Sequence, residues 1–181
     1  MTDILTGARV RLRAPEPADA EAMMAWANDA DFRTYLNLRY PLSLSQEVAW
    51  VAGPAPAYGS ALFAAVLVET GELIGNIDLR TGQPEERVAE LGISIGPAAL
   101  RGQGLGTEML VLACGFGFDE MDLARISLTV HDGNDRARQA YERVGFVHEG
   151  TARQAVRKGG TRRDLHSYGL LPGELRRTAD R

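Results

Sequence analysis

The sequence predicts a mixed α/β (α+β) fold with one sheet of about seven strands and four helices. Three observations support this prediction. Segments that alternate polar and apolar residues, typical of strands, are interspersed with segments whose apolar residues recur every three or four positions, typical of amphipathic helices. Their order is strand, two helices, three strands, helix, strand, helix, two strands, which is neither a doubly wound order nor a bundle. The 181 residues, 45% of them hydrophobic, suffice for one sizeable core.

The N-terminal part of the chain predicts one strand and two helices. Residues 9–13 alternate polar and apolar side chains, as a half-buried strand does. Residues 19–28 carry apolar side chains three and four positions apart, which predicts a helix. Ser43 and Gln46 have the spacing of a capping box, so a second helix is expected to begin there. Its apolar positions are Leu44, Val48 and Val51.

The middle of the chain predicts three strands. Residues 61–68 and 73–79 are apolar and rich in β-formers, and the short connection between them contains Gly71, as a hairpin requires. Residues 88–95 form the next predicted strand, which ends before Pro97 because proline cannot donate to a ladder.

The C-terminal part predicts two more helices around a strand. The first helix covers roughly residues 107–118, and its apolar face consists of Met109, Leu112, Ala113 and Phe116. Residues 125–130 alternate as a strand does. Asn134 or Asp135 can cap the second helix, and Gly145 occupies the position at which helices commonly end.

The last elements are a hairpin and a tail. Residues 146–158 and 161–171 flank two glycines and are predicted to pair. We expect one domain over residues 1–173 and a frayed polar tail over residues 174–181.

Composition excludes several classes of protein. The formal net charge of -4 and the isoelectric point near 5.4 give no reason to expect a nucleic-acid partner. Cys114 is the only cysteine and the three histidines are scattered, so neither a disulfide nor a metal site is expected. The start has no signal-like apolar run and no stretch reaches membrane-spanning length. We therefore expect a cytoplasmic protein without a membrane partner.

A glycine-rich loop, RGQGLG at residues 101–106, lies between a predicted strand and a predicted helix. Such a loop lets the backbone approach a phosphate, and the helix dipole favours the negative charge. A P-loop would need a lysine after the last glycine, and none is present. A Rossmann fingerprint would need glycine at Thr107 and a place in the first βαβ unit, whereas four predicted strands precede this loop. Of the three ligand classes that could use such a loop, namely a P-loop nucleotide, a dinucleotide and coenzyme A, the one left is coenzyme A, bound by its pyrophosphate.

Two motifs resemble the Gcn5-related N-acetyltransferase (GNAT) family. Residues 101–106 match the family pattern Arg/Gln-x-x-Gly-x-Gly/Ala, and NDRARQAYERVGF, residues 134–146, resembles its second motif. The opening RLRAPEPADAEAMMAWAND and the closing FVHEGTARQAVRKGGTRRDLHSYGLL resemble the subgroup of ribosomal-protein N-terminal (RimJ/RimL-like) and bacterial spermidine acetyltransferases. Residues 41–60, where such enzymes shape the acceptor site, match least.

The resemblance implies a set of cofactor-binding residues. Asn134 would bind the pantetheine chain, although asparagine is also a common helix cap. Arg101 would meet a phosphate or remain a solvated loop residue. The backbone of the predicted strand before the loop would face the thioester, and its isoleucines would also pack in the core. The full set is Ile93, Ser94, Ile95, Arg101, Gly102, Gln103, Gly104, Leu105, Gly106, Thr107 and Asn134.

The resemblance also implies two catalytic residues. Glu90 would act as the general base that deprotonates the amine; the alternative is a strand-edge carboxylate with an arginine or solvent partner. Tyr141 would return a proton to the thiolate, since a phenol pKa near ~10 is close to that of an alkyl thiol; the alternative is an aromatic residue of the core.

The predicted function is direct transfer of an acetyl group from acetyl-CoA to a primary amine, which could be a protein N-terminus, a polyamine or a small amine. The sheet is expected to splay after Ile95 to admit pantetheine. A homodimer is expected by analogy with the family. The alternative function is a non-catalytic acyl-CoA sensor or interaction module, which would not depend on Glu90 or Tyr141.

Overall fold

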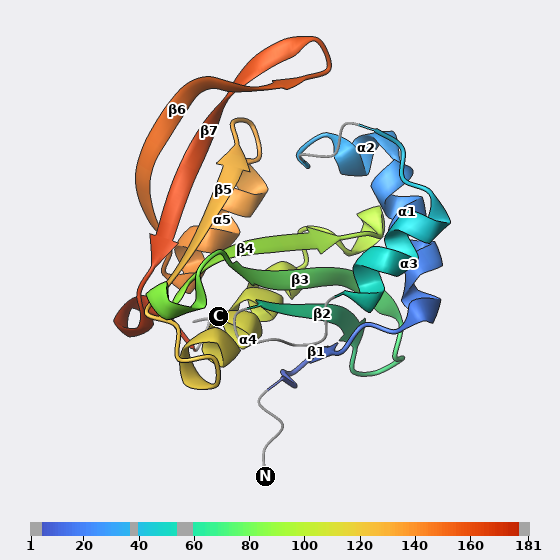
Figure 1. The fold of residues 1–181 in the computed structure, drawn as a ribbon, viewed down its shortest axis with the longest axis horizontal. Helices are drawn as coiled ribbons and strands as arrows, with labels where there is room; N and C mark the ends of the chain where they lie inside the picture. The colour runs from blue at the N-terminus through green and yellow to red at the C-terminus, as the bar shows by residue number, and fades with distance from the viewer. Residues whose placement is uncertain (1–4, 37–39, 54–59, 178–181) are drawn as a thin grey trace.

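One mixed sheet forms the centre of the molecule (Figure 1). The computed structural model describes residues 5–36, 40–53 and 60–177. The strand order is β1-β2-β3-β4-β5-β7-β6. The strands are β1 (Val10–Arg13), β2 (Ser60–Leu67), β3 (Leu73–Thr81), β4 (Val88–Ile95), β5 (Arg125–His131), β6 (Val147–Lys158) and β7 (Thr161–Leu170).

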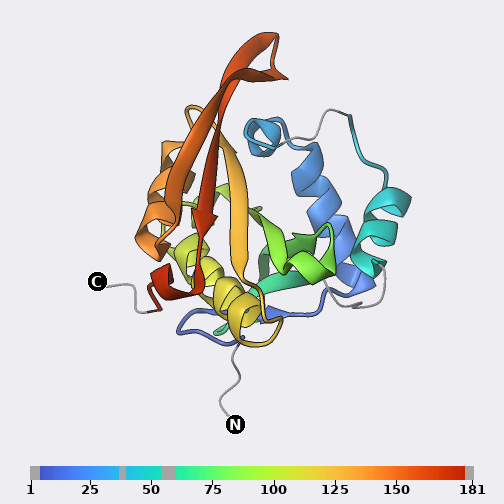
Figure 2. The ribbon, with the colours of Figure 1, turned by 60° about the vertical axis from the view of Figure 1, so that its left-hand side comes forward.

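Helices cover both faces of the sheet. They are α1 (Ala20–Asn28), α2 (Ala30–Arg33), α3 (Leu44–Ala52), α4 (Leu105–Asp119) and α5 (Asp135–Val144). Figures 1 and 2 show α4 and α5 on one side of the sheet and α1, α2 and α3 on the other. Among the described residues, no helix has both the length and the apolar character needed to cross a bilayer.

The core lies mainly between the sheet and α4 and α5. Alternation along the strands decides which side chains enter it. On β2, Phe63 and Ala65 face this main core, whereas Ala64 joins a smaller cluster with Ala20, Met23 and Val51 of α1 and α3. Gly117 brings α4 close to the sheet, because a Cβ there would lie 3.0 Å from Leu79 Cδ1 and 3.1 Å from Ile126 Cδ1.

The sheet opens between β4 and β5. These neighbours run parallel and pair over only three residues, Val88–Glu90 with Arg125–Ser127, whereas all other neighbouring strands are antiparallel. The expectation that the splay begins after Ile95 is therefore wrong, since the two strands separate from Leu91 onward.

Most predicted elements are confirmed, including the capping box at Ser43 and Gln46. Helix α2 was not predicted, because four residues are too few to show a periodicity. Helix α3 turns Val51 inward but leaves Leu44 and Val48 47% and 36% exposed, although they belong to the same predicted apolar set.

The start of the predicted polar tail contacts the rest of the domain. Leu175 packs on the main core, and both Arg177 guanidinium NH₂ groups lie 2.7 Å from the Asp119 carboxylate. The Arg176 amide donates to the Val144 carbonyl. Residues 178–181 lie outside the described part of the chain.

Candidate active site

Many of the predicted site residues lie near the opening between β4 and β5, at the end of the sheet where these two strands terminate. Because these strands are parallel, their carboxyl ends meet there, and such edges are where open α/β sheets bind ligands. The glycine loop follows β4, and Asn134 follows β5. Each segment leads directly into the N-terminus of a helix, α4 or α5.

The glycine loop has the backbone conformation that its sequence predicts. Gly102 and Gly104 both have φ of +82°, a left-handed conformation that other residues adopt at a cost. The first intrahelical hydrogen bond of α4 runs from the Glu108 amide to the Gly104 carbonyl. The amides of Leu105, Gly106 and Thr107 therefore have no intrahelical acceptor, and the positive end of the helix dipole faces the same way. This arrangement suits a pyrophosphate.

Side chains hold the loop in place from both sides. Gln103 donates its amide to the Ala99 carbonyl at 2.7 Å, and Arg9 donates to the Gln103 carbonyl at 2.9 Å. Arg101 donates to the carbonyls of Ile95 and Gly96 at 3.0 and 2.5 Å, and its guanidinium lies over the Phe32 ring. Neither role considered for Arg101, phosphate contact or solvation, describes this geometry, in which Arg101 fixes the end of β4.

Strand β4 presents different groups to the two faces of the sheet. Ile93 and Ile95 pack against the main core, beside α4. Ser94 lies on the opposite face, where its hydroxyl donates to Asn76 Oδ1 at 2.6 Å. Since pairing with β5 stops at Glu90, any amide of Leu91–Ile95 that points toward β5 meets the opening instead of a ladder partner.

Asn134 occupies the N-cap position of α5 without capping it. Its side chain makes no capping hydrogen bond, and its backbone angles are φ −93° and ψ 58°. The local explanation for this asparagine therefore does not apply. The backbone amide of Asn134 donates to the carbonyl of His131, the last residue of β5, at 3.2 Å, which ties Asn134 to the carboxyl end of that strand.

Tyr141 lies on the inner face of α5 within the main core. It is 8% exposed, and its ring contacts those of Phe146 and Tyr168, with centroids 5.9 and 6.2 Å away. Burial raises the pKa of Tyr141 to about 12. The phenol is thus fully protonated at neutral pH, and its pKa is higher than the value assumed from the sequence when the phenol was matched to a thiol.

Glu90 lies on the face opposite to α4, where its side chain is 55% exposed. It pairs with Arg80 on β3 and Ser127 on β5, at the last residue pair before the sheet opens. Glu90 Oε2 is 3.9 Å from Arg80 Nη2, so the arginine partner considered as its alternative role is present.

Asp78 is a second carboxylate at this place, and it was not predicted. It lies opposite Gly92, and a Cβ on Gly92 would come within 2.6 Å of Asp78 Oδ1. Arg80 donates a hydrogen bond to this carboxylate, which is only 9% exposed. Burial raises the pKa of Asp78 to about 6, against the opposing charge of Arg80. The available signal was an acidic residue in the middle of an apolar β-run.

Neither the cysteine nor a metal cluster among the described residues competes with this arrangement. Cys114 is fully buried in α4, and burial raises the pKa of its thiol. Within the part of the chain that the structure describes, no group of three or more His, Cys, Asp or Glu residues could hold a metal ion.

The fold and the site together define an acyl-CoA-dependent acetyltransferase: an opened sheet with a glycine loop at a helix N-terminus on one side and carboxylates on the other. Residues 9–147 match the family model described as acetyltransferase (GNAT) domain, and the chain belongs to this family.

Individual relatives agree with this assignment. The chain is 29% identical over 174 residues to the uncharacterized N-acetyltransferase YoaA of Bacillus subtilis, covering 94% of this chain and 98% of that protein. It is 34% identical over 110 residues to the putative ribosomal N-acetyltransferase YdaF of the same organism, with 61% and 60% covered. The fold resembles spermidine N-acetyltransferase from Vibrio cholerae, solved with CoA and spermine, with a TM-score of 0.84, 23% identity, and 93% and 98% covered.

Proposed function

We propose that this protein transfers an acetyl group from acetyl-CoA directly to a primary amine bound at the same time. One observation carries the proposal: helix α4, into which the glycine loop leads, and the two carboxylates lie on opposite faces of the sheet, beside the opening that begins where the three β4–β5 residue pairs end. A thioester could enter from one face and an amine from the other.

Acetyl-CoA supplies the activated acyl group. The free amides at the start of α4 would bind its pyrophosphate, and the Asn134 carboxamide would bind its pantetheine chain. Amides of Leu91–Ile95 that face the opening are the donors available to a carbonyl oxygen, which gains negative charge during transfer. The three tasks left to side chains are to deprotonate the amine, hold it, and return a proton to sulfur.

A carboxylate would remove the proton from the amine, because only the neutral amine is nucleophilic. The family resemblance favours Glu90 for this role, and burial beside the opening favours Asp78. A carboxylate with a pKa of about 6 is ionised at pH 7.5 and is a stronger base than an ordinary aspartate. Tyr141 would donate the proton that the leaving sulfur needs, after cofactor binding brings the two groups together.

The acceptor class follows from the same face of the sheet. Two carboxylates beside the opening favour an acceptor that arrives as an ammonium ion. Both a protein N-terminus and a polyamine do so; one relative is named a putative ribosomal N-acetyltransferase, and one protein of similar fold is a spermidine N-acetyltransferase. Direct transfer is favoured because the single cysteine is buried in the core and burial raises the pKa of its thiol.

The test measures free CoA thiol continuously, with acetyl-CoA and a panel of polyamines, peptides with free N-termini, aminoglycosides and amino acids. Calorimetric titration of acetyl-CoA accompanies it. Amine-dependent thiol release supports the proposal. Tight cofactor binding without release would favour the alternative, a non-catalytic sensor, and absence of binding would contradict the assignment of the glycine loop.

Two further expectations accompany the proposal. A reducing cytoplasm suits a chain with a single cysteine, and a homodimer remains a prediction by analogy with the family. Sedimentation equilibrium of the purified protein tests the dimer, since a monomeric mass at micromolar concentration would exclude it.

A further inference from the structure

The end of the β6–β7 hairpin projects beyond the sheet. Strand β5 ends at His131, which pairs with Leu165, so residues 153–164 have no further strand beside them. We call these residues the hairpin arm. Figures 1 and 2 show the arm extending past β5 on the side of the molecule that carries α2.

The arm concentrates positive charge in a protein that is acidic overall. It contains five cations, Arg153, Arg157, Lys158, Arg162 and Arg163, whereas the whole chain has a formal net charge of -4. Its one acid, Asp164, accepts a hydrogen bond from the Gln154 amide at 2.8 Å. Among the described residues, no carboxylate lies within 4 Å of the four arm arginines.

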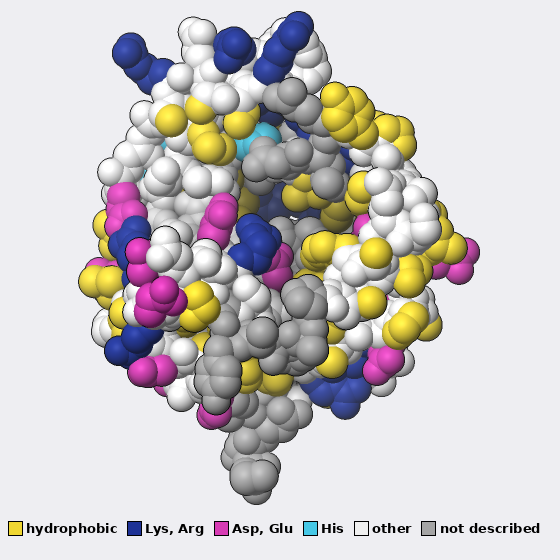
Figure 3. All heavy atoms as spheres, in the orientation of Figure 1, with side chains coloured by type: hydrophobic (Ala, Val, Ile, Leu, Met, Phe, Trp, Pro, Cys, Tyr) yellow, Lys and Arg dark blue, Asp and Glu magenta, His cyan; other side chains and the backbone are white. Residues whose placement is uncertain are grey.

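Two cations of the arm, Arg163 and Lys158, contact the segment that follows α2. The Arg163 guanidinium lies over the Tyr35 ring, 5.7 Å from its centroid, and Lys158 Nζ donates to the Leu36 carbonyl at 2.6 Å. A hollow of about 480 Å³ separates α2 from the arm. Among the described residues that line it, the charged ones are Arg33, Arg157 and Lys158. Figure 3 shows Lys and Arg side chains over the arm and at the back of the hollow below it.

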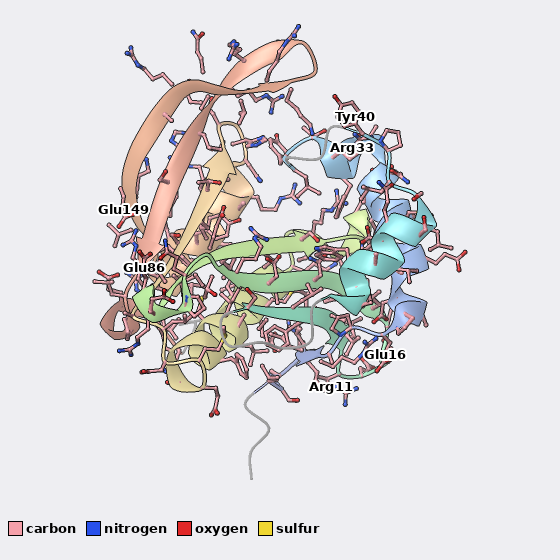
Figure 4. The ribbon with its side chains drawn as sticks, viewed as in Figure 1. Arg11, Glu16, Arg33, Tyr40, Glu86 and Glu149 are labelled. Atoms are coloured by element: carbon pink, nitrogen blue, oxygen red, sulfur yellow. The ribbon has the colours of Figure 1, made fainter. Side chains whose placement is uncertain are left out.

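Protection of an exposed sheet edge explains only part of this charge. Cations on an edge strand discourage pairing between molecules, and β6 is such a strand. Protection of the edge strand accounts for Arg153 and Arg157, which lie on β6. It does not cover Arg163 on the inner strand β7, or Arg33 on α2, which Figure 4 labels across the hollow from the arm.

The register of the sheet gives the distance from the opening to the arm. Ser127 and Thr129 of β5, where β4 and β5 separate, lie opposite Gly169 and Ser167 of β7. Arg163 is therefore four to six residues farther along β7, which corresponds to about 14–20 Å at ~3.4 Å per residue. An extended peptide with its amino group at the opening would reach the arm with roughly its fifth to seventh residue.

We propose that the acceptor is a polypeptide N-terminus followed by acidic residues at about positions five to seven. This proposal rests on the proposed acetyltransferase function and names its substrate class. The carboxylates Asp78 and Glu90 would attract the terminal ammonium, while the arm would attract the acidic side chains that follow. A polyamine fits this charge distribution poorly, because its distal ammonium groups would approach the cations of the arm.

The test compares ten-residue peptides that have the same first four residues. One carries Glu at positions 5–7, one Lys, and one Ser; a fourth carries Glu only at positions 2 and 3. We expect kcat/KM for thiol release to be about tenfold higher with Glu at 5–7 than with Lys, and the difference to shrink in 0.5 M NaCl. Spermidine should be a poorer acceptor than the Glu peptide.

A variant with two reversed charges tests whether the preference for acidic peptides comes from the hairpin arm. Arg157→Glu with Arg162→Glu changes two residues paired across the arm and should abolish or invert the preference. The matched control is Arg11→Glu with Arg143→Glu, which changes the net charge equally at exposed positions of β1 and α5 and should retain the preference. Figure 4 labels Arg11 at the end of the molecule opposite the arm. Acetyl-CoA titration verifies that each variant is folded.

The outcomes separate the two proposals. Thiol release at equal rates with Glu and Lys peptides, or fastest with spermidine, would overturn the acidic-acceptor proposal and leave acetyl transfer intact. Absence of release with every amine would instead contradict the proposed function. If the variant Arg157→Glu with Arg162→Glu does not fold, the acidic-acceptor proposal is still tested by the peptide series, measured with the unaltered protein at low and high salt.

Discussion

The buried carboxylate of Asp78 leads to a prediction in which stability and activity change in opposite directions. Its pKa is raised from an ordinary 3.8 to about 6. A tenfold change in a proton-binding constant corresponds to about 1.4 kcal/mol, so ionising Asp78 in the folded protein costs about 3 kcal/mol more than in the unfolded chain. Because the folded pKa is raised, the folded state binds more protons between pH 4 and 6, and stability falls as pH rises through this window.

We expect Asp78→Asn to remove the cost of ionising this buried carboxylate, which raises the free energy of unfolding, and at the same time to remove the activity. Between pH 5 and pH 8 the wild-type protein should lose about 1.4 kcal/mol of unfolding free energy because of this group, and the variant should not. If Asp78 is the general base, kcat should fall by about 10²- to 10⁴-fold. The low-pH limb of kcat/KM near pH 6 should disappear with it.

Urea denaturation of both proteins at pH 5 and pH 8 measures the first effect, and thiol release from pH 5 to 9 measures the second. Glu90→Gln is the matched comparison, since it neutralises the exposed neighbour. If Asp78→Asn changed the unfolding free energy equally at both pH values, the carboxylate would not have a raised pKa. If only Glu90→Gln lost activity, the base would be Glu90.

Three further substitutions test the other site residues. Tyr141→Phe should lower kcat while acetyl-CoA affinity by calorimetry stays within about twofold; an unchanged kcat would remove Tyr141 as the acid. Asn134→Ala should weaken acetyl-CoA binding, measured by titration, while it lowers the free energy of unfolding, measured by urea denaturation, by less than the ~1 kcal/mol of a lost helix cap. Unchanged binding with a full loss of ~1 kcal/mol would identify a structural cap instead. Gly102→Ala should lose roughly 1–2 kcal/mol of stability, because its φ is +82°, and bind acetyl-CoA less tightly. Gly82→Ala, in open space without a positive φ, serves as its control, and equal effects would argue against a special loop conformation.

Local patterns sufficed for most of the fold. Alternation and Pro97 predicted the bounds of β4 correctly at both ends, and Gly145, with φ of +116°, ends α5 as expected. The two glycines of the last turn, with φ of +54° and +82°, connect the predicted hairpin. Each of these features depends on residues close together in the chain, so the sequence contains the whole signal.

The features that the sequence did not predict depend on strand register and side-chain direction. Asp78 is buried because Gly92, fourteen positions later, leaves space for its carboxylate. Arg101 turns back to the carbonyls that end β4, where a phosphate contact or a solvated position was expected. The position at which β4 and β5 part depends likewise on the register between strands that are far apart in the chain, which no local pattern encodes.

The short seam between β4 and β5 has a mechanical consequence. Three residue pairs join the sub-sheet β1–β4 to the sub-sheet β5–β7, fewer than join any other two neighbouring strands, so we expect the angle between the two sub-sheets to be the least constrained in the sheet. An extended ligand that forms hydrogen bonds with both β4 and β5 across the opening would take the place of an eighth strand and fix the angle between the two sub-sheets. The melting temperature should then rise with acetyl-CoA concentration, by the equivalent of about 2.7 kcal/mol at a hundredfold excess over Kd. The edge amides of Leu91–Ile95 should gain the most protection from hydrogen exchange.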